Sequence, residues 1–206
     1  TLLDKMLIKA LACAEGNACM DRIVAAPTGG ACGIIPAVLL TIMEEHEIPR
    51  EQIVMGLFTS GAIGMTIAKR ASISGAEGGC QAECGSASAM AAGALVEILG
   101  GTANMIGHAA AIALKGVLGL VCDPVAGLVE VPCIKRNALG AANALSSANL
   151  ALAGIESKIP VDEVIDAMKQ VGDLMTPALK ETSEAGLATT QTAINFNQKL
   201  YGNNNT

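Results

Sequence analysis

The segment Ala82–Leu99 reads AECGSASAMAAGALVEIL, a run of small and aliphatic residues that ends at Gly100 and Gly101. Alanine favours helix, and the small side chains would let neighbouring helices approach this one closely. Alternation of apolar and polar residues with a period of two, which would indicate strands, is not sustained over any length of the chain. The sequence therefore predicts an all-α fold, with a single compact helical domain over residues 1–206.

Breaks at glycine and proline divide the rest of the chain into further expected helices. Their approximate ranges are 2–25, 36–47, 51–70, 102–118, 137–153 and 160–172. Thr102 is expected to cap the helix that follows it. The remaining expectations are a loop over 71–80, a turn over 122–127, a short extended piece over 128–131 and a frayed tail from about residue 200.

Composition excludes several classes of partner. The net charge of −6 argues against nucleic acid, because phosphate binding needs a basic face. There is no polybasic run for an anionic membrane surface. The most apolar stretch, residues 104–121, contains His108, Lys115 and three glycines, so it predicts a buried or amphipathic helix and not a membrane span.

The seven cysteines are an odd number in a long, alanine-rich chain without a signal peptide pattern. A secreted disulfide framework is generally short and has an even count. We therefore expect a cytoplasmic protein whose thiols have a metal-binding role.

Three of the cysteines lie in irregular segments. Cys80 follows two glycines, Cys122 precedes Asp123 and Pro124, and Cys133 follows a proline. A structural cysteine usually lies on the apolar face of a helix, whereas a metal cluster needs thiolates from several loops with free backbone N–H groups nearby. The spacing is wide and contains no CxxC motif, so three small core residues remain the alternative.

Three segments carry a resemblance to a known family: SISGAEGGCQAE at 72–83, LVCDPVAGLVEVPCIKRN at 120–137 and APTGGACGIIPA at 26–37. They resemble iron–sulfur-dependent L-serine dehydratases, and the similarity extends from about residue 17 to residue 188. The resemblance implies a helical catalytic unit, namely the C-terminal part of an alpha chain whose N-terminal portion is absent here. It also implies a regulatory beta chain or a homo-oligomer, and a role in amino-acid degradation and gluconeogenesis.

The same resemblance places a 4Fe–4S cluster on Cys80, Cys122 and Cys133, which leaves one iron without a protein thiolate. That iron would act as a Lewis acid on the hydroxyl of L-serine while a base removes the α proton, giving pyruvate and ammonia. One alternative is an L-cysteine desulfhydrase with the same cluster. A second is an electron carrier, for which Cys84 is the nearby candidate for a fourth ligand. A third is a folded module that is inactive without its missing parts.

His108 is one of two histidines, and its near-neutral intrinsic pKa suits proton transfer. The pattern alone favours a hydrogen-bonded core histidine, but the family that the chain resembles also has a histidine near this point, which raises the functional interpretation to equal weight. We therefore expect His108 to be the catalytic base and assign His46, in a charged stretch, no role.

Two loops could hold the substrate carboxylate, because they offer hydroxyls and N–H groups near helix starts. The expected substrate-binding residues are Thr28, Gly29, Gly30, Ser72, Ser74, Gly75 and Asn137. Simple capping of the next helix is the alternative for the hydroxyls. Lys135 and Arg136 could balance the charge of the site. Cys32 and Cys84 depart from the family pattern, and Cys13 and Cys19 have no predicted role.

Overall fold

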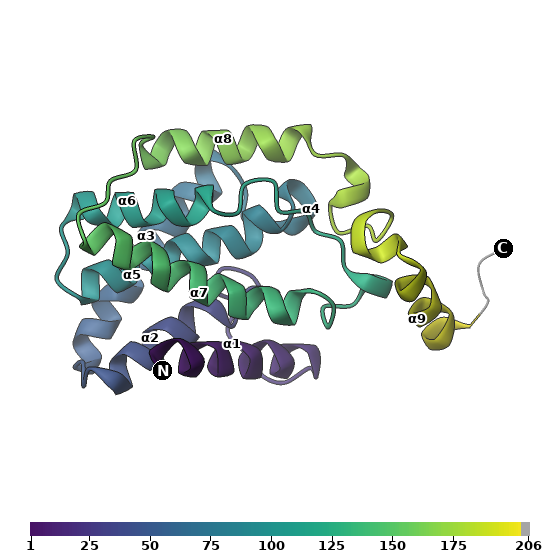
Figure 1. The fold of residues 1–206 in the computed structure, drawn as a ribbon, viewed down its shortest axis with the longest axis horizontal. Coiled ribbons are helices and arrows are strands. Elements are labelled where there is room, and N and C mark those ends of the chain that lie inside the picture. The colour runs from purple at the N-terminus through teal and green to yellow at the C-terminus, as the bar shows by residue number, and fades with distance from the viewer. Residues whose placement is uncertain (203–206) are drawn as a thin grey trace.

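The computed structural model of the chain describes residues 1–202. Over this range the chain forms nine α-helices and no β-strand, which confirms the all-α prediction (Figure 1). The helices are α1 (Leu2–Ala18), α2 (Ile34–Glu45), α3 (Arg50–Arg70), α4 (Gly75–Gly78), α5 (Ser86–Ile98), α6 (Ala103–Lys115), α7 (Cys133–Leu152), α8 (Val161–Leu174) and α9 (Gln191–Tyr201). Most of the tail that was expected to fray, residues 203–206, lies outside the described residues.

Helix α5 is the centre of the fold. It packs against α2, α3, α6 and α7, and every one of its residues except Glu97 is buried. Its small residues allow close packing, and the hydroxyl of Ser88 makes polar contacts there. Ser88 Oγ lies 2.8 Å from Cys84 O and 3.1 Å from Gly140 O, and the second contact joins α5 to α7. The small-residue segment therefore allows the close approach of neighbouring helices that its composition indicated.

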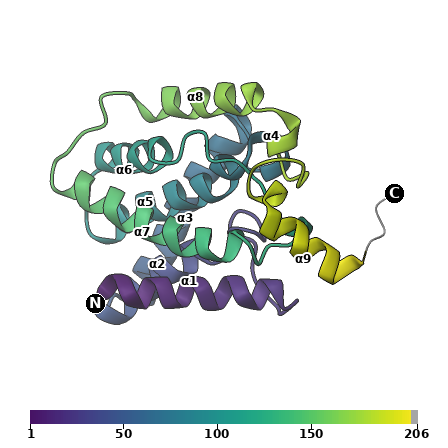
Figure 2. The same cartoon turned by 45° about the vertical axis from the view of Figure 1, so that its right-hand side comes forward.

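The other helices surround α5 on several sides (Figures 1 and 2). Helices α1 and α2 lie together on one side, where α1 packs against α7, and α8 covers α6 on the opposite side. Arg70 on α3 binds α8 through Asp166, with Nη2 and Oδ2 2.6 Å apart. An exposed ion pair contributes only about 0–1 kcal/mol. The position of α8 therefore depends mainly on the burial of Val164, Ile165 and Met168.

Several boundaries differ from those expected. The first helix ends at Ala18, and the chain then turns through Met20 at a positive φ of 63°. Residues 129–132 form a turn where an extended piece was expected, and α7 begins directly after it at Cys133. Thr102 Oγ1 accepts the N–H of Met105, which confirms the predicted cap.

Two helices occur where none was expected. Helix α4 is a single turn inside the glycine-rich loop. Helix α9 lies in the polar tail and projects from the body of the fold (Figure 2). Ala193 is its one buried residue, so it carries little of the apolar pattern by which helices are recognised. No helix in the described part of the chain is long and apolar enough to cross a membrane.

Candidate active site around four cysteines

Cys80 lies where the glycine-rich loop enters the central helix. It follows Gly79, whose φ of +75° favours glycine, and it precedes a single π-helical turn, Gln81–Gly85, that continues into α5. A Cβ atom on Gly79 would lie 2.8 Å from Met175 Sδ and 2.9 Å from Leu120 O. Glycine is therefore required here both by the backbone conformation and by the space available.

Gln81 fixes this turn from inside the protein. Its backbone N–H donates to Leu120 O at 2.9 Å, and its side-chain Nε2 donates to Met168 O at 3.0 Å. Its Oε1 accepts the N–H of Gly119 at 2.9 Å. The fully buried amide thereby holds the Cys80 turn against α8 and against the segment that leads to Cys122.

Cys122 and Cys133 come from two further segments. Cys122 pairs with the segment after α8: its N–H donates to Leu179 O at 2.9 Å, and its carbonyl accepts the N–H of Glu181 at 2.8 Å. Cys133 is the first residue of α7. Both are buried, with 2% and 5% of their surface exposed.

The cysteine side chains converge on the sulfur of Cys80. Hydrogen bonds from Cys122, Cys133 and Cys84 hold the pKa of Cys80 far below its usual range. Burial opposes this shift, and the nearby cation of Arg136 adds to it. The same interaction with Cys80, followed by burial, raises the pKa of Cys122 and of Cys133. The group therefore favours a thiolate at Cys80. The neighbouring cysteines stay protonated and donate hydrogen bonds to it. A metal would replace those protons, because cysteine binds metals as the thiolate.

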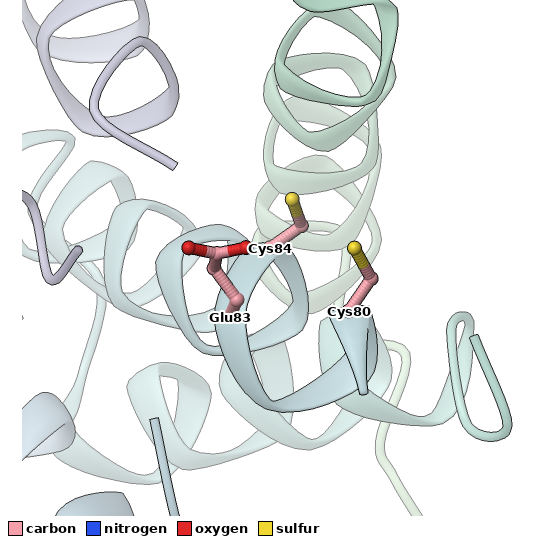
Figure 3. A group of neighbouring side chains, drawn as sticks. All are labelled: Cys80, Glu83 and Cys84. Atoms are coloured by element: carbon pink, nitrogen blue, oxygen red, sulfur yellow. The ribbon is translucent and has the colours of Figure 1, made fainter. Parts of the chain in front are cut away.

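Cys84 and Glu83 belong to the same group. The ligand atoms of Cys80, Glu83 and Cys84 all lie within 4.8 Å of one another, and the three side chains project to the same side of the turn (Figure 3). Thiolates from separate chain segments are the ligands typical of iron–sulfur clusters and zinc. The residues present therefore fit a thiolate-bound metal or cluster, and the donor group is larger than the three cysteines expected.

Arg136 links two of the cysteine segments. Its Nη1 lies 3.3 Å from Cys80 Sγ and donates to Val121 O at 2.9 Å, while Nη2 binds Asp123 Oδ1 at 2.9 Å. Asp123 Oδ2 in turn accepts the N–H of Leu187 at 2.8 Å. The expectation of charge balance fits Arg136, which faces the thiolate, whereas Lys135 is exposed.

The loop with Thr28 and Gly30 reaches the same place. Thr28 Oγ1 donates to Glu83 Oε1 at 2.5 Å, and a Cβ atom on Gly30 would lie 2.5 Å from that same oxygen. Asn137, on α7, donates to Gly30 O at 2.7 Å and to Cys133 O at 2.9 Å, and it accepts the N–H of Gly33 at 2.9 Å. Asn137 thus ties the loop to a cysteine segment.

Gly75 brings the second expected substrate loop to the cysteines. A Cβ atom there would lie 3.3 Å from Cys122 Sγ and 3.6 Å from both Glu181 Oε2 and Glu83 Oε2. The absence of a side chain on Gly75 leaves space between these groups. Two carboxylates and a cysteine sulfur therefore border one small region, and burial raises the pKa of Glu83 there.

The structure does not bring every expected residue to this region. Ser72 lines a different cavity of about 440 Å³ near α8, and its Oγ accepts the N–H of Ser74 at 3.0 Å. His108 Nδ1 accepts the N–H of Ser157, at 3.2 Å, in the connection after α7. Cys133 begins α7, whose 20 residues span about 30 Å, so the contact of His108 with Ser157 lies beyond the opposite end of that helix. Its role as a base stays a prediction.

Sequence reasoning missed two carboxylates. Glu83 lies three residues after Cys80, which on a helical turn places both side chains on one face. This spacing could have identified Glu83. Glu181 is distant in sequence, lies in a polar segment and adopts a positive φ of 68°, so no local signal indicated it.

The fold and the site define an all-helical protein with a buried, cysteine-rich centre whose residues fit a thiolate-bound metal. Residues 1–188 match the family model described as serine dehydratase alpha chain. The chain therefore belongs to the serine dehydratase alpha chain family.

Known members of the family are similar over nearly the whole chain. The "Probable L-serine dehydratase, alpha chain" of Bacillus subtilis is 56% identical over 194 residues, which cover 94% of this chain and 65% of that relative. The L-serine dehydratase alpha chain of Peptoniphilus asaccharolyticus is 56% identical over 190 residues, which cover 92% and 65% respectively. The corresponding chain of Latilactobacillus sakei is 51% identical over 193 residues, covering 94% and 92%. The chain thus spans 65% of the length of the first two relatives.

Proposed function

We propose that this chain is the cluster-holding part of an L-serine ammonia-lyase, which converts L-serine to pyruvate and ammonia. The observation that carries the proposal is the convergence of Cys122 and Cys133 on the sulfur of Cys80, from three separate segments. The relatives are named L-serine dehydratase alpha chains, which supports the substrate and the reaction. They also support a separate partner chain, and we propose a cytoplasmic enzyme that works with a beta chain.

Cys80, Cys122 and Cys133 would hold a 4Fe–4S cluster. When bound, such a cluster with one iron free of protein thiolate supplies a Lewis acid for the serine hydroxyl. The chain's own contribution begins with burial, because all three cysteines are at most 5% exposed and water is largely excluded from their sulfurs. Arg136 adds a permanent positive charge 3.3 Å from Cys80 Sγ, which offsets the charge that three thiolates bring.

The Thr28–Gly30 loop would hold the substrate carboxylate. It lies just before α2, and within the described residues the N–H groups of Gly29 and Gly30 donate to no protein acceptor. Free backbone N–H groups near a helix start are a favourable site for an anion. Gly75 would line the same region. Asn137 would act by fixing the loop, since its hydrogen bonds go to backbone groups. Ser72 and Ser74 would act by shaping the turn that places Gly75.

Glu83 is the titratable carboxyl best placed to exchange a proton with the substrate. Its Oε1 accepts the hydroxyl of Thr28, and its Oε2 faces the space beside Gly75. Burial raises its pKa, which makes this carboxyl a better proton acceptor than an ordinary glutamate. His108 is the candidate from the sequence, and the two residues are separable by substitution.

Anaerobic reconstitution with ferrous iron and sulfide tests the proposal, with pyruvate release from L-serine as the readout. The alpha chain at full length, with its beta chain, is compared with the Cys122→Ser variant and with Cys19→Ser, which changes an exposed cysteine. We expect pyruvate from the wild type and from Cys19→Ser, and none from Cys122→Ser. A cluster that forms without any pyruvate release would refute the lyase.

Two other functions, an L-cysteine desulfhydrase and an electron carrier, are the alternatives to the L-serine lyase. Iron accepts sulfur as well as oxygen, so L-cysteine is a second substrate to assay beside L-serine. Cys84 lies within 4.8 Å of the Cys80 ligand atom, and a four-cysteine cluster would favour electron transfer. A substrate-induced change in the electron paramagnetic resonance spectrum separates the lyase from the electron carrier, because a fully cysteine-bound cluster offers serine no iron site.

A further inference from the structure

Cys13 and Cys32 form a second thiol pair, outside the group around Cys80. Cys13 lies on α1 and Cys32 just before α2, and their sulfur atoms are 3.8 Å apart. Each sulfur also approaches the other residue's carbonyl oxygen: Cys13 Sγ to Cys32 O is 3.4 Å, and Cys32 Sγ to Cys13 O is 3.9 Å. The two side chains therefore face each other.

The two thiols differ in access to solvent. Cys13 is partly exposed, whereas Cys32 is fully buried. Burial, and then the neighbouring Cys13, raises the pKa of Cys32 to about 12, so Cys32 keeps its proton at neutral pH. A small oxidant would therefore meet Cys13 first, and Cys32 would wait beside it as a protonated thiol.

We propose that Cys13 and Cys32 are a thiol-oxidation site, which a hydroperoxide converts to an intrachain disulfide. In the first step the Cys13 thiolate attacks one oxygen of hydrogen peroxide, the O–O bond breaks, and the hydroxide released takes up a proton as water. Cys13 is then a sulfenic acid. In the second step the Cys32 sulfur displaces the sulfenic hydroxyl, which leaves with the Cys32 proton as a second water. Two thiols lose two electrons in total, and one peroxide gains them.

The geometry requires a modest movement. A disulfide has an S–S length of about 2.05 Å, so the sulfurs must approach by more than an ångström. Rotation of the partly exposed Cys13 side chain would supply part of this approach, and a shift of the turn that holds Cys32 would supply the rest. That turn continues from Thr28, which donates to Glu83. Oxidation would thus tether α1 to the loop that borders the cysteine group, whatever reaction that group performs.

Peptide mapping of the full chain tests the proposal with hydrogen peroxide as the probe. Trypsin leaves Cys13 and Cys19 together in peptide 10–22 and Cys32 alone in 23–50, and it places the cysteines of the main group in 71–115 and 116–135. Cleavage after Glu15 then separates Cys13 from Cys19. Non-reducing mass spectrometry therefore identifies which sulfur atoms are joined, without any substitution in the chain.

We expect peroxide to yield a Cys13–Cys32 link in the wild type and in Cys19→Ser, reversed by dithiothreitol and absent in Cys13→Ser. We also expect slower amide hydrogen exchange over residues 26–33 after oxidation. The proposal is overturned if Cys32 stays fully alkylatable after peroxide, if the link runs to Cys19, or if Cys13 proceeds to sulfinic acid with Cys32 unchanged. Because the wild type carries the main measurement, a misfolded variant does not weaken the test.

Discussion

Arg136 Nη1 lies 3.3 Å from the sulfur of Cys80, although 56 residues separate them in the chain. The same guanidinium binds Asp123, so one side chain joins the start of α7, the turn before α5 and the segment of Cys122. All three expected ligand segments therefore meet at Arg136. The stability of the site therefore depends on this residue, and so would its binding of the proposed cluster.

Arg136→Met should destabilise the chain strongly. The side chains of Arg136 and Asp123 are only 13% and 5% exposed, so removal of the cation leaves a buried carboxylate without its partner. Breaking such a pair costs about 3–5 kcal/mol. Urea denaturation followed by circular dichroism measures the change. Lys135→Met, at the exposed neighbouring position, is the control and should change stability by less than about 0.5 kcal/mol.

Iron content should separate the roles of Cys80 and Cys84. Cys80→Ala removes the sulfur around which the other thiols gather, so we expect the reconstituted chain to lose its cluster. Cys84→Ala should keep it, because a cluster with one open iron needs no fourth thiolate. Iron and acid-labile sulfide per chain are the measurement. Loss of both in Cys84→Ala would instead make Cys84 a ligand and favour the electron carrier.

Gly30→Ala should disturb the site far more than Gly29→Ala. The new Cβ at position 30 would lie 2.5 Å from Glu83 Oε1, so the carboxylate must move and its bond from Thr28 is broken. At position 29 the nearest atom is Asn17 Oδ1 at 3.7 Å, which is ordinary contact. We expect serine-dependent pyruvate release to fall about tenfold or more in Gly30→Ala, since even small misplacements are costly in catalysis. Equal rates in the two variants would contradict the assigned place of this loop.

The helical class and the convergence of Cys80, Cys122 and Cys133 could be predicted from the sequence. The rest of the site was predicted less completely. The helical class follows from local patterns such as Ala82–Leu99, and the cysteines are carried by long family motifs. Contacts between distant segments leave no local pattern. Glu181 reaches the site through a parallel bridge between Cys122 and Lys180, and His108 is bonded to a loop beyond the opposite end of α7. The polar helix α9 was missed because little of its surface is buried.

Glu83 should make the cluster-free chain less stable as pH rises. Burial raises its pKa above the ordinary 4.5. Between the unfolded and the folded pKa, the folded chain therefore binds more protons than the unfolded chain. Stability from this group is fully present below the unfolded pKa and is lost as pH rises through the folded pKa. Glu83→Gln should remove that loss. Denaturation midpoints from pH 4 upward give the difference between wild type and variant, which cancels the contributions of all other carboxyls.

The same substitution should also distinguish Glu83 from His108 as the group that exchanges a proton with serine. Removal of a general acid or base typically costs about 10²–10⁴-fold in rate. Glu83 borders the space beside Gly75, whereas His108 is bonded to Ser157 in the connection after α7. We therefore expect Glu83→Gln to lose at least a hundredfold in pyruvate release with its cluster intact, and His108→Asn to lose much less. A larger loss in His108→Asn than in Glu83→Gln would instead identify His108 as the base. Glu83 would then serve only to position Thr28.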